Sequence, residues 1–421
     1  MAQCLLSLRS YPNFELSEEE KSMKAFMKKS SVGFVGGVLC LFACGNNPQS
    51  PDPEPDKGPE VVPTETIPGV NRGGFKIRTL VGDLNTPWDL VLASDGKLWI
   101  TQRNGTVTVV DTSSGLAQEV GTISGVLERG ESGLMGMALH PDFPANSSIY
   151  FAHSYDGGGG SVKNRLVRAG FDGFQLHSQE TLLDDIPGSF NHNGSRLLIG
   201  PDRLLYMTTG DAEGPNRAID LNSLAGKLLR LDLDGRAAPG NPFATEIFSF
   251  GHRNPQGLAF APSTNTLYAT EHGPSSNDEI NLILVGRNHG WPEVHGYCHD
   301  EDVFGGAEAQ FCRENDVNEP IAVWTPTIAP AGAEFYTSTS IPGWNGSLLL
   351  VTLKDQALYR ITLGSEGGRA VGQEVLFQGE FGRLRDVAVG GRGELYLATS
   401  NRDGRGDILG ADRIIQVTYN P

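Results

Sequence analysis

Short apolar runs recur along residues 74–421, each preceded by turn-forming residues and followed by small ones. No long segment of this body has the apolar spacing of an amphipathic helix, and glycine is abundant at 54 residues. The pattern predicts an all-β protein. Six runs share one form: SDGKLWIT from Ser94, NSSIYFAHS from Asn146, PDRLLYMTTG from Pro201, TNTLYATEHG from Thr264, NGSLLLVTL from Asn345 and RGELYLATS from Arg392.

The recurrence of these runs also predicts the architecture. Repeats at intervals of roughly 40 to 50 residues, stretched by insertions, are typical of β-propellers, in which each four-stranded blade contributes one copy. Six copies therefore predict a six-bladed β-propeller over residues 74–421. The terminal segments GFKIRTLVGDL (74–84) and DRIIQVTYN (412–420) are expected to share one blade and close the ring. Two β-sandwich domains in tandem are the alternative, although no Pro-rich or charged linker divides the body.

The first 43 residues resemble a targeting sequence. From Met27 the chain carries two lysines and then an apolar stretch, Val32–Ala43, which is the composition of a signal peptide over residues 27–43. Cys44 follows the sequence LFA, which resembles a lipobox, so lipidation of Cys44 is expected; an ordinary cleaved signal is the alternative. Both alternatives predict export, and the first predicts a lipid anchor on a bacterial membrane, at the periplasm or cell surface.

Two flanking segments complete this N-terminal organisation. Residues 1–26 are acidic in their middle and unlike a signal, so we interpret them as a mis-assigned extension, with Met23 or Met27 as the initiator. Residues 44–73 are rich in proline and acidic residues, which favours an extended linker. The folded domain is therefore expected to begin near Gly74.

Charge and cysteine content narrow the function classes. A formal net charge of -17 argues against a nucleic-acid partner, because phosphate binding needs a basic surface. Only Cys298 and Cys312 lie in the predicted domain. In an oxidising compartment two cysteines separated by a short loop predict a disulfide, with two unpaired thiols as the alternative.

Several loops next to the apolar runs are dense in polar groups. Taken singly, each loop is weak evidence for a functional site. Arg253 is compatible with a structural salt bridge, and His192 with an ordinary loop hydrogen bond. In their order along the chain, however, they resemble the pyrroloquinoline-quinone-dependent soluble aldose dehydrogenases, or glucose/sorbosone dehydrogenases, from about Pro87 to about Val417. These segments are RGESGLMGMALHPDF from Arg129, FNHNGSRL from Phe190, GHRNPQGLAF from Gly251, TEHGPSSNDEINLILVGRNHGWP from Thr270, WTPTIAPAG from Trp324, LLLVTLKDQALYRI from Leu348 and GRLRDVAVG from Gly382.

The resemblance implies a six-bladed propeller that binds pyrroloquinoline quinone (PQQ), an ortho-quinone with three carboxylates. Cationic side chains suit such a ligand, and Arg383 and Arg385, two apart on a strand, would point the same way. The residues that match the family's cofactor-binding positions are Arg253, Asn254, Thr327, Lys354, Arg383 and Arg385, with Glu131 and Asn191 at two further positions.

The same resemblance implies that His192 removes the proton from the anomeric hydroxyl of an aldose. Imidazole suits this role because its unperturbed pKa of about 6.5 leaves it mostly neutral at pH 7. Two neighbours depart from the best-known glucose oxidisers: Asn191 replaces an aspartate, and Glu131 replaces a glutamine. We expect the added negative charge of Glu131 to require compensation by calcium or by Arg129.

Calcium is the second cofactor implied by the resemblance, because a hard dication takes oxygen ligands and can polarise the quinone. The family uses backbone carbonyls at positions matched by Gly273 and Pro274, and Glu279 matches a ligand of an additional structural calcium. His289 and His299 stand where the family often has a tyrosine and an aspartate, which puts this additional site in doubt.

The function predicted from sequence is therefore oxidation of an aldose to its lactone, with the sugar and an external electron acceptor as partners. Two other classes stay open. A calcium-dependent lactonase-like hydrolase would need side-chain carboxylates converging on the channel and would leave Lys354, Arg383 and Arg385 unexplained. An exported sugar- or ligand-binding propeller without catalysis would be consistent with Asn191 and Glu131.

Overall fold

The computed structural model describes residues 74–298, 307–405 and 411–420, which belong to one compact unit. The predicted extension, signal peptide, Cys44 and linker, together with His299, lie outside the described residues. Within the described part of the chain, no helix is long and apolar enough to cross a membrane.

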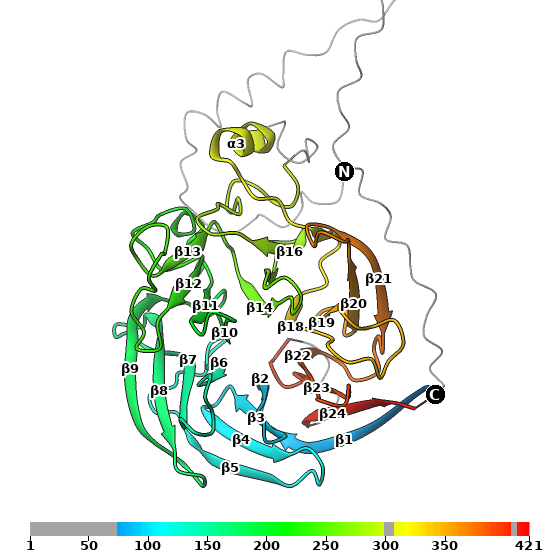
Figure 1. Cartoon of the computed structure of the whole chain (residues 1–421). Coiled ribbons are helices and arrows are strands. Elements are labelled where there is room, and N and C mark those ends of the chain that lie inside the picture. Colours follow the sequence, from blue (N-terminus) through cyan, green and yellow to red (C-terminus); the bar gives the residue numbers. More distant parts are fainter. Residues whose placement is uncertain (1–73, 299–306, 406–410, 421) are drawn as a thin grey trace, which may run out of the picture. The chain divides into compact units, whose positions relative to one another are not determined.

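Six four-stranded antiparallel sheets stand in a ring (Figure 1). In each of the first five sheets, the strands follow chain order from the channel outward. Their bounds are β2 (Pro87–Leu92), β3 (Lys97–Gln102), β4 (Thr106–Asp111) and β5 (Ala117–Thr122); β6 (Leu134–Leu139), β7 (Ser148–Asp156), β8 (Val162–Phe171) and β9 (Leu176–Pro187); β10 (Gly194–Ile199), β11 (Leu205–Thr209), β12 (Lys227–Leu231) and β13 (Ile247–Phe250); β14 (Pro255–Phe260), β15 (Leu267–Glu271), β16 (Asp278–Ile283) and β17 (Ala322–Trp324); and β18 (Pro330–Phe335), β19 (Leu348–Thr352), β20 (Leu358–Leu363) and β21 (Ala370–Leu376).

The sixth sheet closes the ring with both ends of the domain. Its order is β22 (Leu384–Val389), β23 (Leu395–Thr399), β24 (Asp412–Tyr419) and β1 (Phe75–Leu84). β1 and β24 are antiparallel, from the pair Phe75 and Tyr419 to the pair Leu84 and Asp412. This is the pairing expected from the sequence. The six sheets form a six-bladed β-propeller, and the alternative of two β-sandwich domains is wrong.

The six apolar runs found in the sequence occupy equivalent places in this ring. They contain β3, β7, β11, β15, β19 and β23, the second strand of every sheet from the channel. These strands are almost fully buried, because both faces of a blade pack against neighbouring blades. A strand buried on both faces gives a continuous apolar run in place of an alternating one, which is why these strands are the visible repeat.

Buried charges hold the innermost strands together across the channel. The Arg196 Nη1 atom on β10 donates to Asp89 on β2 and, over 3.0 Å, to Asp386 on β22. Backbone N–H groups also donate to these carboxylates, that of Met137 to Asp89 and that of Leu90 to Asp386, both at 2.7 Å. Carboxylates do converge on the channel, as a lactonase requires, but these two are used in structural bonds.

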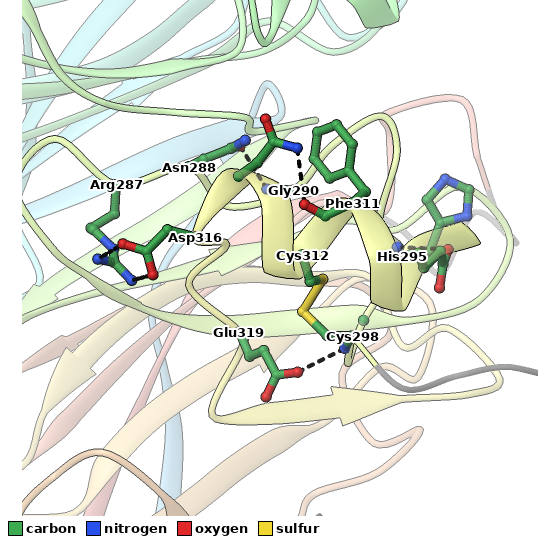
Figure 2. The surroundings of a disulfide bond; sticks show 12 residues. Arg287, Asn288, Gly290, His295, Cys298, Phe311, Cys312, Asp316 and Glu319 are labelled. Carbon is green, nitrogen blue, oxygen red and sulfur yellow. Dashed lines mark hydrogen bonds and ion pairs between the residues drawn. A yellow bond between two sulfur atoms is a disulfide. The ribbon is translucent and has the colours of Figure 1, made fainter. Parts of the chain in front are cut away.

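An insertion follows β16 and carries the helix α3 (Ala307–Asn315); the 3-10 helix η2 (Pro215–Arg217) lies between β11 and β12. A disulfide joins Cys298 to Cys312 on α3, with Cα atoms 5.9 Å apart (Figure 2). The Cys298 N–H also donates to Glu319 over 2.8 Å. Both contacts join residues of the insertion to one another, so they stabilise the insertion internally.

Candidate active site

A polar cavity of about 210 Å³ lies at the end of the channel where the innermost strands begin. Each of β2, β6, β10, β14 and β22 contributes a lining side chain or glycine, and Ala329 precedes β18. Ring closure therefore brings together residues from all six blades. The lining residues are Trp88, Arg103, Gly130, Glu131, Met135, Asn193, Gly194, Gln256, His272, Ala329, Leu353, Lys354, Arg383, Arg385, Asp403 and Arg405.

Cationic groups outnumber carboxylates among these lining residues. Arg383 and Arg385 both face the cavity, as their spacing predicts, and both are nearly buried. Arg383 donates to Asp403 through Nε and Nη2 over 2.9 and 2.8 Å, while Arg385 Nη1 donates to Gln256 over 2.9 Å. The pKa of Arg385 is lowered to about 10, mainly by burial; Asp403 opposes this shift and the neighbouring Arg383 adds to it. The cavity thus favours an anionic ligand.

The remaining predicted cofactor residues lie next to this cavity. Lys354 lines it and donates a hydrogen bond to Thr327. The side-chain oxygen of Asn254 accepts from Gly194 N over 3.1 Å and from Gln256 Nε2 over 3.0 Å, so Asn254 supports two lining residues from behind.

His192 stands beside the cavity, in the loop that leads into β10. Its backbone has a φ of 58°, a left-handed conformation, and its carbonyl accepts from Ala212 N over 3.1 Å. Gly210 makes this close approach possible, because a Cβ atom there would stand 1.9 Å from the His192 carbonyl oxygen. The loop is therefore held against the end of β11.

A buried carboxylate orients the imidazole. His192 Nδ1 lies 2.8 Å from Asp211 Oδ1, and Asp211 is 1% exposed. The other oxygen, Asp211 Oδ2, accepts from Trp291 Nε1 over 2.9 Å, and Oδ1 also accepts from the Glu213 N–H over 2.9 Å. The carboxylate is therefore held on both oxygens and fixes the plane of the ring.

Two neighbours of His192 specify the same tautomer. An ionised carboxylate only accepts hydrogen bonds, so Nδ1 carries the proton toward Asp211. A guanidinium only donates, and Arg253 Nη2 lies 3.0 Å from His192 Nε2. Nε2 therefore presents a lone pair, and the arrangement provides a base whose acceptor atom is set by contacts on both sides.

Comparison with known proteins identifies the family of this chain. The sequence model of the glucose/sorbosone dehydrogenase family matches residues 84–410. The chain belongs to the glucose/sorbosone dehydrogenase family. It is 30% identical to quinoprotein glucose dehydrogenase B of Acinetobacter calcoaceticus, covering 77% of this chain and 85% of that protein. It is also 30% identical to the aldose sugar dehydrogenase YliI of Escherichia coli, covering 78% and 91%.

The fold comparison points to the same family. The PQQ-bound aldose sugar dehydrogenase of Streptomyces coelicolor superposes with a TM-score of 0.71 and 36% sequence identity, over 82% of this chain and 98% of that one. The family resemblance and the six-bladed propeller predicted from the sequence are therefore confirmed.

The two departures from the best-known family pattern meet at one side chain. Arg405 Nη1 lies 2.7 Å from Glu131 Oε1, and Arg405 Nη2 donates to the Asn191 side-chain oxygen. Burial raises the pKa of Glu131, but Arg405, His272 and the His192 N–H outweigh it and leave the pKa below its ordinary value. The compensating cation is thus Arg405, whereas Arg129 lies over the Phe190 ring at 4.2 Å.

Asn191 does not supply the partner of the imidazole in this member of the family. Its side-chain nitrogen donates to Glu213 over 3.0 Å, while Asp211 from the following strand end contacts His192. Although Asn191 replaces an aspartate, a carboxylate still contacts the ring, because Asp211 reaches it from another loop.

The predicted calcium residues lie in and after the loop between β15 and β16. Gly273 donates its N–H to Asp278 over 2.8 Å, and Pro274 follows on the surface. Glu279 accepts from Gly296 N over 2.9 Å, and burial together with Glu271 raises its pKa to about 8. His289 stacks on His252, with ring centroids 4.5 Å apart. Within residues 74–298, 307–405 and 411–420, no three His, Cys, Asp or Glu side chains are arranged to hold a metal.

Sequence reasoning missed several residues of this family site. Asp211 directly follows the third apolar run, which places it at the same end of the sheet as His192. This position could have predicted that the two side chains lie close together. Trp291 lies in the segment RNHGWP, which contributes to the family resemblance, but no role was predicted for its tryptophan. Arg405 and Asp403, which lie in the loop after β23, have no comparable signal because only ring closure brings that loop to the cavity.

Proposed function

We propose that this protein oxidises an aldose at its anomeric C–OH to the lactone, with PQQ and Ca²⁺ as cofactors and His192 as general base. When bound, the quinone supplies the hydride acceptor, and a dication beside it would increase its electrophilicity. The observation that carries the proposal is the cationic cavity beside a histidine whose Nε2 presents a lone pair.

The residues of the cavity fit a planar tricarboxylate. Arg103, Lys354, Arg383, Arg385 and Arg405 line it, and among the described lining residues the carboxylates are those of Glu131 and Asp403. The buried Nε atoms of Arg103 and Arg385 have no hydrogen-bond partner among the described residues, so donors are available for further acceptors. Charge-assisted bonds to such groups contribute about 1.5 to 3 kcal/mol each. Lys354, Arg383 and Arg385 are the residues we assign to hold the cofactor.

His192 would accept the hydroxyl proton at Nε2, and Asp211 would stabilise the resulting imidazolium. Arg253, which donates to Nε2 in this structure, would release that atom to the sugar hydroxyl and move toward the cofactor. Its pKa is lowered by burial, against the effect of Asp211, and a bound carboxylate would compensate that desolvation.

For calcium we propose the carbonyl oxygens of Gly273 and Pro274 as ligands, with Glu279 as a ligand of a second ion. Carbonyl oxygens suit a hard dication, and Glu279 would be ionised by a bound cation. We further propose that the enzyme is exported and anchored through Cys44, and that an external electron acceptor returns it to the oxidised form.

Reconstitution tests this function. Purified protein incubated with PQQ and CaCl₂ is expected to oxidise aldoses in a dye-linked assay, and His192→Ala to abolish turnover while the absorbance of bound cofactor is retained. His177→Ala is the matched control, since His177 is exposed on β9. Absence of both sugar oxidation and quinone binding would refute the proposal in favour of a non-catalytic binding propeller.

A further inference from the structure

The ion pair between Glu131 and Arg405 carries an inference about substrate choice, which rests on the proposed function. We propose that this pair is a specificity determinant that keeps the sugar-facing side of the cavity electrically neutral and so selects uncharged aldoses. If one residue of the pair is neutralised, the enzyme is then expected to accept sugars whose charge is opposite to that of the remaining residue.

The pair lies directly beside the base. Glu131 Oε1 is 2.7 Å from Arg405 Nη1, and Glu131 Oε2 accepts the backbone N–H of His192 over 3.0 Å. Arg405 donates in turn to Asn191, the residue before His192. Both members of the pair are thus one hydrogen bond from the loop that carries the base, and a sugar positioned for proton transfer to His192 lies near both.

The pair also lies at the open side of the cavity. The Arg405 side chain is 52% exposed and that of Glu131 is 21% exposed, although both line the cavity. Arg383 and Arg385 are below 10% exposed and are bonded to Asp403 and Gln256 deeper inside. The charges that an entering sugar meets are therefore those of the pair, and the inner cations are left for the cofactor.

The electrostatic consequence has opposite signs for the two partners. With Arg405 intact and Glu131 neutralised, a guanidinium faces the sugar and attracts a uronate. With Glu131 intact and Arg405 neutralised, a carboxylate faces the sugar and attracts a protonated amino sugar. In the wild type each charge satisfies the other, so a charged substituent would have to compete with an existing ion pair at 2.7 Å.

The experiment compares the reconstituted holoenzyme of the wild type with Glu131→Gln, Arg405→Gln and the double variant. D-glucose, D-glucuronate and D-glucosamine are the probes, at a pH at which the amine is protonated, and kcat/KM is measured at low and high salt. Arg402→Gln is the matched control, because Arg402 is an exposed arginine of the same loop that is not among the described residues lining the cavity.

Glu131→Gln is expected to raise the glucuronate-to-glucose ratio of kcat/KM by about tenfold, and Arg405→Gln the glucosamine-to-glucose ratio by a similar factor. The double variant should return both ratios to within about threefold of the wild type, and high salt should reduce both effects. A purely structural pair would instead lower activity toward all three sugars by one common factor, which overturns the inference.

Two further outcomes are separable. An active wild type whose ratios do not change in any variant contradicts this inference alone, whereas a wild type that oxidises no sugar contradicts the proposed function and this inference with it. If a single variant does not fold, as judged by thermal unfolding, Glu131→Asp and Arg405→Lys replace it. These substitutions keep the charge but move it away from its partner by changing the length or shape of the side chain. Smaller shifts of the same kcat/KM ratios are expected.

Discussion

Asp211→Asn is the substitution that tests how the base is prepared. The carboxylate of Asp211 accepts three N–H groups: the Nδ1–H of His192, the indole N–H of Trp291 and the backbone N–H of Glu213. An amide offers one oxygen and one NH₂ group, so it cannot accept on both sides. Asparagine is nearly isosteric with aspartate, and the fold is therefore expected to survive.

Either orientation of the new amide has a cost. If the amide oxygen faces Trp291, the NH₂ group faces His192 Nδ1, and Nδ1 must then accept a hydrogen bond. The ring proton therefore moves to Nε2. Nε2 is the atom that should accept the proton of the sugar hydroxyl. With its oxygen toward His192, its NH₂ faces the indole N–H, and a buried donor is left unsatisfied, which costs about 1 to 3 kcal/mol.

The expected magnitude follows from the bond that is lost. A hydrogen bond from an incipient imidazolium to a buried carboxylate contributes about 1.5 to 3 kcal/mol, which corresponds to a fall in kcat of roughly 10- to 150-fold. The assay is dye-linked aldose oxidation at saturating sugar, with cofactor affinity measured separately by titration. Asp220→Asn is the control, because Asp220 is an exposed carboxylate that bonds within its own turn.

The reasoning would be refuted by a variant that keeps kcat within threefold of the wild type while binding the cofactor normally. It would also be refuted if Asp211→Asn weakened cofactor binding alone, because Asp211 contacts His192 and Trp291 and is not among the described residues that line the cavity.

Three other predictions concern the cavity, the channel and the disulfide. Arg385→Met should weaken PQQ binding by about 10- to 150-fold without abolishing it, measured by titration of the apoprotein, since one charge-assisted contact is removed. Glu334→Gln should raise the melting temperature by a few degrees at pH 8.5 and leave it unchanged near pH 4.5. Burial raises the pKa of Glu334 from 4.5 to about 8, so the wild type loses up to a few kcal/mol of stability as pH rises between these values. The glutamine keeps an acceptor for the Val389 N–H, which donates to Glu334 over 2.7 Å; equal pH dependence of the two proteins would contradict this. Replacing Cys298 and Cys312 by serine should lower the free energy of unfolding by about 3 kcal/mol, because the bond closes a loop with a sequence separation of 14. Denaturant unfolding measures this, and an unchanged midpoint would be the contrary result.

The fold could be predicted from the sequence because the second strand of each blade, counted from the channel, is covered on both faces by the neighbouring blades. β3, β7, β11, β15, β19 and β23 are apolar on both faces for that reason, and their recurrence marks the blades. The pairing of β1 with β24 followed from the same logic, since an open ring would leave two unpaired edges.

Contacts between blades were not predictable in the same way. Arg405 is separated from Glu131 and Asn191 by more than 200 residues, and only the curvature of the ring brings the three together. From the sequence, calcium or Arg129 was expected to compensate Glu131; Arg129 is near in sequence but lies over Phe190. The sequence predicts His192 as the base, whereas its contact with Asp211 depends on the close approach at Gly210, a feature of the folded backbone.

The measurement that tests the central claim most directly is the anaerobic reduction of bound cofactor by an aldose. Wild type and His192→Ala, both loaded with PQQ and Ca²⁺ to the same absorbance, would be mixed with excess sugar and followed by stopped-flow absorbance. The account predicts rapid reduction of the cofactor in the wild type and a rate lower by a factor of about 10² to 10⁴ in the variant. Equal rates in the two proteins, or no reduction in the wild type by any aldose, would contradict it.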